Sequence, residues 1–546
     1  MKQLRELLQQ IVQECFEHEI EIKLTRPESR FGDYATNVAL QLAPLVGEKP
    51  REIAEKILAK LTEGIIQKTE VAGPGFINIW LSDSALAQEA ATLPEIGGQY
   101  KKIVIETNNP NPFKAMHIGH AFNAILADTI ANLLDLSEAT VHRVSYHGDV
   151  GAHVGKSMYS LLKYCSGDPS RLLEISEHER NTFMSRMYAD GAKAYAADDA
   201  TKAKIDHLAQ LSFTLGDPTY KQIYEVVKGW SFEEIDAIVA RLGNKPIEKR
   251  YLESQADARG VQTVKTYTPA VFKHSDGAYI FEGSKHGSFD NVFVSSRGRG
   301  LYGARDLGLM ELKHEDFQAE KSYIVTAEEQ RDYFKGVIAA AELCLPELKN
   351  VTVNISHGTV KLTTGKMSSR SGDVLEIDWL FDQIAAAIEA RGGTPTDELI
   401  AGALRYQFLR VRVGGDVVFN VNEAVSLQGN SGPYLQYAHA RACSILEKSK
   451  KTADNLEDIV FDENERAVVR KLGEYADVVE VSVNELLPHH MCHYLYELAQ
   501  EFNRFYENSR IIGDSREAER LAIVQLYRDI LARGLAILGI HTPNTM

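Results

Sequence analysis

The sequence predicts a multidomain α/β protein, with a parallel-sheet domain, a small α/β domain before it and an all-α bundle after it. Three observations lead to this prediction. The 546 residues are enough for three or four domains with sizeable cores. Strand and helix patterns alternate from residue 101 to about 395, as a parallel sheet with crossover helices requires. From about residue 396 the strand patterns end and amphipathic helical patterns follow.

Residues 1–95 form the first predicted domain, a small α/β unit. Three helices are expected in it, near 2–18, 35–45 and 50–63. Apolar residues on both sides of Gly73 predict a pair of strands. The segment 93–102 contains a Gly-Gly pair, and it is expected to link this domain to the next.

Residues 101–395 form the predicted sheet domain. Its strand candidates are short apolar runs at 102–106, 140–146, 322–326 and 351–355. The gap between the second and third candidates is long. Residues about 160–290 are therefore expected to form an inserted, partly helical subdomain.

Residues 396–546 are expected to form a helical bundle. Apolar residues from Leu495 to Phe505 mark one amphipathic helix, and those from Leu521 to Leu535 mark another. The spacing Asp514-x-x-Glu517 predicts a capping box at the start of the second helix.

Composition excludes several classes of protein. The net charge of −16 argues against a protein that coats nucleic acid nonspecifically. No apolar run approaches the length of a membrane span, and the first residues form an acidic amphipathic pattern, unlike a signal peptide. The five cysteines are scattered singly, which predicts no structural metal and no disulfide framework. We expect a cytoplasmic protein without a membrane partner.

The segment from Glu106 to His120 is the most informative part of the chain. It joins a buried strand to a helix, and His117 and His120 stand at the start of that helix. The first amides of a helix are unpaired donors in a positive dipole field, so a triphosphate would bind there. Gly119 would let the nucleotide approach the backbone. Glu106 stands at the carboxyl end of the strand, where α/β sheets bind ligands.

Two glycine motifs and one lysine-containing loop bear on nucleotide binding. Gly298-x-Gly300-x-x-Gly303 matches a dinucleotide fingerprint, but the next strand ends without an acidic ribose partner. A nicotinamide-dependent oxidoreductase is the alternative that it supports. Gly151 to Ser157 is one residue too short between its glycines for a P-loop. The third loop, Gly365 to Gly372, is polar and carries Lys366 and Arg370; alone, it is a solvated surface turn.

The histidine pair and the lysine loop together resemble the two signature sequences of class I aminoacyl-tRNA synthetases. The stretches FGDYATNVALQLA, EVAGPGFINIWL, NPNPFKAMHIGH, SYHGDVGAHVGK, LYGARDLGLM, LQYAHARACSILEK, FNRFYENSRI and GLAILGIHTPNTM are similar to those of arginyl-tRNA synthetases. The resemblance spans nearly the whole chain and is weakest at 160–290. It implies a Rossmann-like catalytic domain that activates L-arginine with ATP and transfers it to the 3′-terminal adenosine of tRNA(Arg), through the 2′-hydroxyl. It also implies that activation needs bound tRNA. Mg²⁺ is expected to arrive with ATP, since the sequence shows no dedicated acidic cage.

The resemblance also implies roles for individual residues. Those of catalysis are His117, His120, Lys366, Ser368 and Lys114. Those of ATP binding are His117, Gly119, His120, Lys366, Met367 and Ser369. Those of arginine binding are Glu106, Asn111, Tyr302, Asp306 and Gln330. A planar guanidinium favours carboxylates that accept two parallel hydrogen bonds, which fits Glu106 and Asp306. Which of the two acids meets the guanidinium stays open. The competing interpretations are a structural salt bridge of Asp306 with Arg305 or Lys313, and a core position for Tyr302.

The sequence departs from the family pattern at three places. Ser369 stands where the second lysine of the loop is usual, and Lys114 is expected to supply that charge. Arg297-Gly-Arg299-Gly replaces a more usual Asp-Gly-Thr. Tyr333 stands where a histidine is common after Gln330.

The flanking domains are expected to bind the tRNA. By resemblance, residues 1–95 would contact the tRNA elbow through Phe76 and Asn78. Residues 396–546 would contact the anticodon, with Tyr437 and Arg441 as candidates. A core strand and interdomain packing are the competing interpretations. A monomer is expected. A catalytically idle tRNA-binding relative is the remaining alternative, and it would be expected to lack the histidine or lysine motif.

Overall fold

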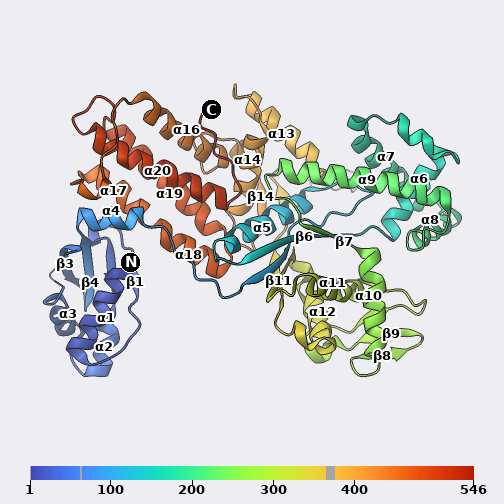
Figure 1. The fold of residues 1–546 in the computed structure, drawn as a ribbon, viewed down its shortest axis with the longest axis horizontal. Coiled ribbons are helices and arrows are strands. Elements are labelled where there is room, and N and C mark those ends of the chain that lie inside the picture. The colour runs from blue at the N-terminus through green and yellow to red at the C-terminus, as the bar shows by residue number, and fades with distance from the viewer. Residues whose placement is uncertain (1, 62–63, 364–374) are drawn as a thin grey trace.

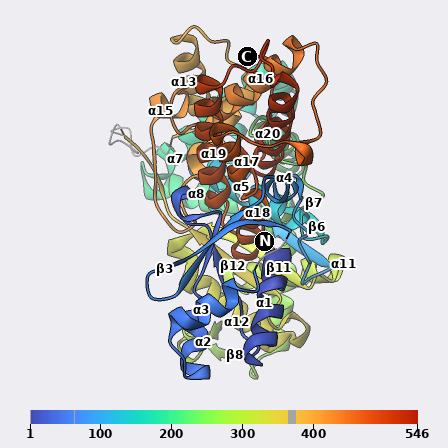
Figure 2. The same ribbon diagram turned by 90° about the vertical axis from the view of Figure 1, so that its left-hand side faces the viewer.

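The computed structural model describes residues 2–61, 64–363 and 375–546. A parallel sheet lies in the middle of an elongated molecule (Figure 1). The N-terminal region and the C-terminal helices lie on one side of it, and a group of inserted helices lies on the other. Viewed from the side, the C-terminal helices stand above the N-terminal region (Figure 2). The fold is the predicted one, a multidomain α/β protein with a helical C-terminal domain.

The N-terminal region is a four-stranded antiparallel sheet, in the order β1-β2-β4-β3, covered by helices. Its elements are α1 (Lys2–Phe16), β1 (Leu24–Thr25), β2 (Tyr34–Thr36), α2 (Val38–Val46), α3 (Pro50–Leu58), β3 (Ile66–Ala72), β4 (Phe76–Leu81) and α4 (Asp83–Ala91). The three expected helices and the strand pair are present. Ser82 caps α4 by accepting a hydrogen bond from the backbone N–H of Ala85.

The central sheet has five parallel strands in the order β12-β11-β5-β6-β7. They are β5 (Lys102–Glu106), β6 (Thr140–His147), β7 (Lys249–Leu252), β11 (Lys321–Ala327) and β12 (Thr352–His357). Four of them are the predicted strands. The sequence analysis missed β7, because this edge strand is only four residues long and begins with Lys249 and Arg250. The order reverses between β5 and β11, so the crossovers leave in opposite directions there.

Helices cover the sheet, and the longest insertion enters between β6 and β7. The covering helices are α5 (Ile118–Asp135), α10 (Glu253–Thr266), α11 (Tyr302–Phe317) and α12 (Arg331–Cys344). The inserted helices are α6 (Ala152–Cys165), α7 (Arg180–Tyr195), α8 (Asp199–Leu211) and α9 (Pro218–Arg241). A second insertion is a three-stranded antiparallel sheet of β8 (Phe272–Ser275), β9 (Ala278–Phe281) and β10 (Asn291–Val294). The stretch 160–290 is therefore interrupted by β7 and α10, which belong to the central layers.

The C-terminal region is helical. Its elements are α13 (Ile377–Glu389), α14 (Asp397–Leu409), α15 (Val421–Ala424), α16 (Gly432–Lys448), α17 (Glu463–Leu472), α18 (Tyr475–Glu485), α19 (His489–Asn508) and α20 (Glu517–Ile537). One strand was not expected here: β14 (Val417–Phe419) pairs in parallel with β13 (Val360–Leu362). Both strands have three residues, too few for an alternating pattern to be detected.

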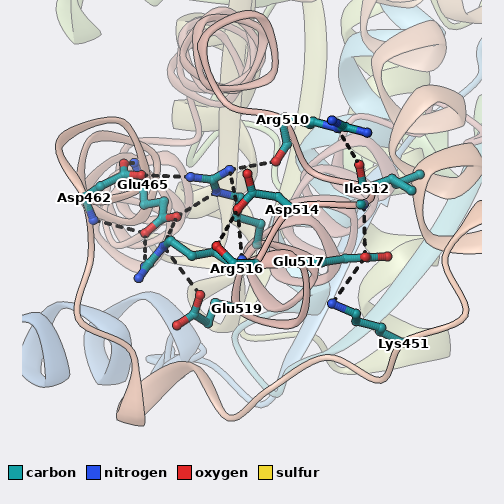
Figure 3. Close-up of polar contacts among 12 residues, drawn as sticks. Lys451, Asp462, Glu465, Arg510, Ile512, Asp514, Arg516, Glu517 and Glu519 are labelled. Atoms are coloured by element: carbon teal, nitrogen blue, oxygen red, sulfur yellow. Dashed lines mark hydrogen bonds and ion pairs between the residues drawn. The ribbon is translucent and has the colours of Figure 1, made fainter.

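A cluster of charged side chains joins α17 to α20 (Figure 3). The buried Glu465 carboxylate accepts hydrogen bonds from Arg516 and Arg520, and Arg520 also pairs with Asp462. The capping box predicted for α20 does not form as expected. Arg516 is the N-cap residue, the Asp514 carboxylate accepts from the Arg516 backbone N–H, and Glu517 accepts from Gly513. The two acids therefore serve the turn before the helix, because the arginines of the cluster hold that turn in place.

Arg405 of α14 joins three regions of the molecule. Its side chain is fully buried, and its Nε donates to the Leu538 carbonyl at the end of α20, at 2.6 Å. Its second terminal nitrogen lies 2.9 Å from the Asp128 carboxylate of α5, and its first donates to the Leu242 carbonyl after α9 at 3.0 Å. Gly539 has φ +68°, and a Cβ there would lie 2.2 Å from the guanidinium. The glycine therefore leaves the space that the buried cation occupies.

Removing the Arg405 guanidinium should destabilise the protein strongly. Arg405→Met removes the cation that lies 2.9 Å from the buried Asp128 carboxylate and leaves that acid with the longer contact to Arg143, at 3.6 Å. Breaking a buried ion pair in this way costs about 3–5 kcal/mol. The midpoint of urea unfolding, followed by far-UV circular dichroism, checks this. Lys361→Met, which breaks an exposed pair with Asp416, is the control and should leave the midpoint almost unchanged. Similar shifts for the two variants would contradict the central role of Arg405.

Candidate active site

A cavity of about 350 Å³ opens at the carboxyl ends of the central strands. It lies where the strand order reverses, between β5 and β11, which is where open α/β sheets bind ligands. The residues that line it are Glu106, Asn109, Tyr146, Tyr302, Asp306, Leu309, Ile324, Thr326, Gln330, Tyr333 and Phe334. Two acids separated by 200 positions in the sequence thus share one cavity with aromatic walls.

Glu106 ends β5 and is already paired inside the protein. Its Oε1 lies 2.6 Å from the Lys313 Nζ of α11, and both side chains are 2 % exposed. Asn109 donates from Nδ2 to the other oxygen, Oε2, at 2.7 Å. The same asparagine accepts from the backbone N–H of Tyr146 at 2.8 Å, so it holds β6 against the acid. The charge of Glu106 is therefore balanced before any ligand enters.

Asp306 lies one turn into α11 and accepts a hydrogen bond from the Tyr333 hydroxyl. Burial raises the pKa of the Asp306 carboxyl to about 7; the Tyr333 bond opposes this shift, and Glu106 adds to it. The competing interpretation, a salt bridge with Arg305 or Lys313, is wrong.

The two candidate cations have other partners. Arg305 pairs with Glu253 and Asp257 of α10, at 3.0 and 3.1 Å, and Lys313 pairs with Glu106. Among the residues that the structure describes, Asp306 is the cavity acid without an ion-pair partner. A cation that entered the cavity could therefore form an ion pair with Asp306.

Tyr302 and Gln330 line the same cavity from two sides. Tyr302 opens α11 and is 71 % exposed, which rules out the core position considered for it. Gln330 ends the short helical turn before α12. Asn111 is not among the lining residues; its Oδ1 accepts from the backbone N–H of Gly148 at 2.8 Å.

Three polar lining residues were missed by the sequence analysis, Asn109, Tyr146 and Thr326, and a fourth, Tyr333, was noted there only as a departure from the family pattern. Tyr146 and Thr326 end two of the predicted strands, 140–146 and 322–326. Their position at carboxyl ends was the signal that could have identified them. Asn109 lies in the turn after β5, where sequence alone does not indicate which way a side chain points, and Tyr333 lies in the first turn of α12.

His117 and His120 face each other at the start of α5. Each imidazole Nδ1 accepts from the backbone N–H of the other residue, at 3.3 and 3.4 Å, and the rings stack 3.5 Å apart. Since Nδ1 accepts, the ring proton belongs on Nε2, which leaves an N–H donor on each ring. Burial lowers the pKa of His117 to about 4 and that of His120 well below its usual value. Both rings are therefore neutral donors near pH 7.

Gly119 makes room for this histidine pair. A Cβ at this position would lie 3.1 Å from Nδ1 of His117. Lys114 lies in the preceding turn, where burial lowers the pKa of its amine against the raising effect of Glu253. The remaining candidates, Lys366, Met367, Ser368 and Ser369, lie outside the described residues.

The other glycine motifs have no nucleotide-site geometry. The Gly298–Gly303 segment joins β10 of the small antiparallel sheet to α11, so it does not follow a strand of the parallel sheet. Gly151 is the N-cap of the inserted helix α6. The structure therefore gives no support to the nicotinamide-dependent alternative.

The four candidate tRNA contacts differ in exposure. Phe76 is 42 % exposed at the start of β4, whereas Asn78 is buried in that strand. Tyr437 and Arg441 lie one turn apart on α16, and the guanidinium lies 4.9 Å from the tyrosine ring centroid. Arg441 also donates to Asn503 of α19 at 3.0 Å.

The described residues contain neither a candidate metal site nor a membrane-spanning helix. No group of three or more His, Cys, Asp or Glu side chains in the described parts of the chain could hold a metal ion. Within the same parts, every helix is too short or too polar to cross a bilayer.

Three known proteins resemble this chain, one by its sequence and two by their solved structures. An arginine–tRNA ligase of Aliivibrio salmonicida is 29 % identical over 95 % of this chain and 94 % of its own length. The solved structure of Thermus thermophilus arginyl-tRNA synthetase matches with a TM-score of 0.80 at 22 % identity, covering 100 % of both chains. That of Plasmodium falciparum arginyl-tRNA synthetase matches with a TM-score of 0.78 at 20 % identity, covering 100 % of this chain and 99 % of the other. The two structures establish the shared fold.

Three family models match consecutive parts of the chain. The arginyl tRNA synthetase N terminal domain matches residues 2–81, and the DALR anticodon binding domain matches residues 435–546. The catalytic domain of class I (R) tRNA synthetases matches residues 82–390, more than half of the chain. With these domains in this order around a cavity that holds an unpaired acid, the chain belongs to the arginyl-tRNA synthetase family.

Proposed function

We propose that this arginine–tRNA ligase recognises the guanidinium of its substrate with Asp306. The observation that supports the proposal is the charge distribution in the cavity: Lys313 neutralises Glu106, whereas Asp306 has no cation among the described residues. A guanidinium is always charged and carries only donors, so it needs acceptors and a negative partner. Lysine has the same charge but cannot form the planar fork. Leaving the buried acid half paired costs about 2–5 kcal/mol, enough to discriminate without a separate editing step.

The other cavity residues would orient the substrate. Glu106 keeps lone pairs free beside its bonds to Lys313 and Asn109, and we assign it to the α-ammonium side. Gln330 would hold the amino-acid backbone or the edge of the guanidinium, and Tyr302 would cover the mouth of the cavity. Asn111, which does not line the cavity, would act by holding the turn at Gly148.

The reaction consists of two in-line steps. The carboxylate of L-arginine attacks the α-phosphorus of ATP, which releases pyrophosphate and forms arginyl-adenylate. A terminal ribose hydroxyl of tRNA then attacks the adenylate and releases AMP. No protein nucleophile is required, so catalysis rests on positioning and on stabilising the charge of the phosphates. We propose the 2′-hydroxyl as the attacking group.

His117 and His120 would donate from Nε2 to phosphate oxygens as negative charge develops. Neutral rings suit this task because they keep the donor without losing a proton to the phosphates. Lys114, and Lys366 with Ser368 from the second signature, would stabilise the leaving pyrophosphate. We propose that Met367 and Ser369 contact ATP and that Gly119 keeps the histidine rings in place. Since the described residues form no metal cluster, Mg²⁺ would arrive bound to ATP, and no step is assigned to it.

The flanking domains would hold the tRNA. We propose that residues 1–95 meet the tRNA elbow, that residues 101–395 catalyse the reaction and that residues 396–546 bind the anticodon. The exposure of Phe76 and the stacking of Arg441 on Tyr437 support direct contacts with bases, whereas buried Asn78 would support its strand. We further propose a cytoplasmic monomer, since five free cysteines suit a reducing compartment.

The substrate assignment is tested by exchange of labelled pyrophosphate into ATP, in the presence of tRNA, with each amino acid in turn. Arginine should support exchange at least about a hundredfold better than lysine, as the loss of a paired fork predicts. Exchange supported by lysine, glutamate or cysteine, and not by arginine, would overturn the assignment.

Asp306→Asn should raise the KM for arginine by about 30-fold or more, because the amide cannot balance a buried cation. The KM for ATP should stay unchanged. His120→Ala should instead lower kcat of activation, since it removes a donor to the phosphates. Steady-state exchange kinetics separate the two. If both variants changed the same parameter, the division of roles would be refuted.

Arginine binding should strengthen as the pH rises towards 7. The pKa of Asp306 is raised to about 7, so the carboxyl holds its proton below that pH and cannot pair with the guanidinium. The groups that face it are Glu106 of β5, Tyr146 of β6, Glu253 of α10, Lys313 of α11 and Tyr333 of α12. The KM for arginine should fall by up to about tenfold per pH unit below 7 and level off above 8. Asp306→Asn should abolish this dependence, and a flat profile for the unmodified protein would exclude Asp306 as the titrating group.

A further inference from the structure

Tyr333 is the polar residue that α12 contributes to the lining of the cavity. It lies in the first turn of that helix, lines the cavity and donates its hydroxyl proton to Oδ2 of Asp306. Its ring meets the ring of Phe334 edge-on at 5.1 Å, and Phe334 is itself buried. The phenol is thus held by packing on one side and ends at the carboxylate on the other.

We propose that Tyr333 is a positioning residue for arginine, whose hydroxyl orients the Asp306 carboxylate so that its second oxygen faces the cavity. This rests on the proposed role of Asp306. The carboxylate can turn about its last side-chain bond, a broad torsion, unless one oxygen is anchored. A fork of two N–H donors needs the plane of its partner to be defined, because bidentate pairing is geometrically specific. One bond to Oδ2 defines that plane and leaves Oδ1 free to accept.

The surroundings of Asp306 explain why it needs a donor. Glu106 and Glu253 both oppose its ionisation, and burial opposes it further, whereas the Tyr333 bond favours it. Burial and the nearby Asp306 charge raise the pKa of Tyr333 far above its usual value, so the phenol keeps its proton and remains a donor at working pH. The hydroxyl oxygen also has lone pairs, which an N–H of the guanidinium can use.

The chain contains a matched control, a second tyrosine that donates to a carboxylate on α11, the helix that carries Asp306. Tyr251 donates its hydroxyl proton to Asp316 of α11 at 2.6 Å, so it forms the same kind of bond as Tyr333. Tyr251 is 2 % exposed, and neither it nor Asp316 lines the arginine cavity. Tyr251→Phe therefore removes a phenol–carboxylate bond without touching the proposed site.

The experiment compares Tyr333→Phe with Tyr251→Phe by tRNA-dependent pyrophosphate exchange over pH 6 to 9. Tyr333→Phe should raise the KM for arginine about tenfold or more at pH 7, in line with a lost hydrogen bond to a charged group. Its kcat and its KM for ATP should change less than about twofold. The fall of the arginine KM with pH should move to higher pH, because the carboxylate has lost a donor. Preference for arginine over lysine should decrease.

Tyr251→Phe should leave all of these parameters unchanged, and melting temperatures show whether both variants are folded. If Tyr333→Phe left the arginine KM and its pH profile unchanged while Asp306→Asn raised the KM, the positioning role would be refuted and the role of Asp306 would stand. If neither variant changed the KM, both proposals would fail. A Tyr333→Phe effect on kcat alone would also refute the proposal.

Discussion

One buried guanidinium, that of Arg405, holds the molecule together where its regions meet. It contacts Asp128 and Thr129 of α5, the residues that follow α9, and the carbonyl that ends α20. A cation in this position is stable only because every donor finds an acceptor, and an uncompensated charge at the same depth would be very costly. Helix α5 begins at the histidine pair, so its placement by Arg405 sets where those rings stand relative to the sheet.

The buried charges around the cavity also need partners. Lys313 and Glu106 form a buried ion pair, and Arg305 is held by Glu253 and Asp257. Among the described residues, Asp306 is therefore the cavity acid that can still form an ion pair with a ligand. A carboxylate held in this way binds a cation tightly because its desolvation cost is already included in the folded state. The raised pKa of Asp306 is the sign of that cost.

The donors that the start of α5 would offer to phosphates are neutral imidazoles. The two imidazoles cap α5 through their Nδ1 atoms, so the helix terminus that would hold a triphosphate also sets the tautomer of its side chains. Gly119 permits this arrangement because a side chain there would press on the His117 ring. The backbone geometry at the start of α5 therefore also determines which nitrogen of each ring is the donor.

Local sequence patterns predicted most of the elements, and together with the family resemblance they named most of the candidate site residues. Periodicity and turn residues are local, so they located the four long strands, the helices of the bundle and the strand-to-helix junction at His117. They failed for β7 and β14, which are too short for a pattern, and for the cap of α20, where Arg516 and Arg520 pair with the distant Glu465. Family resemblance located Glu106 and Asp306 but left their roles open. Only the tertiary structure decided that Lys313, 207 residues from Glu106, neutralises that acid and that Tyr333 holds the other, because charge balance in a cavity depends on which side chains the fold brings together.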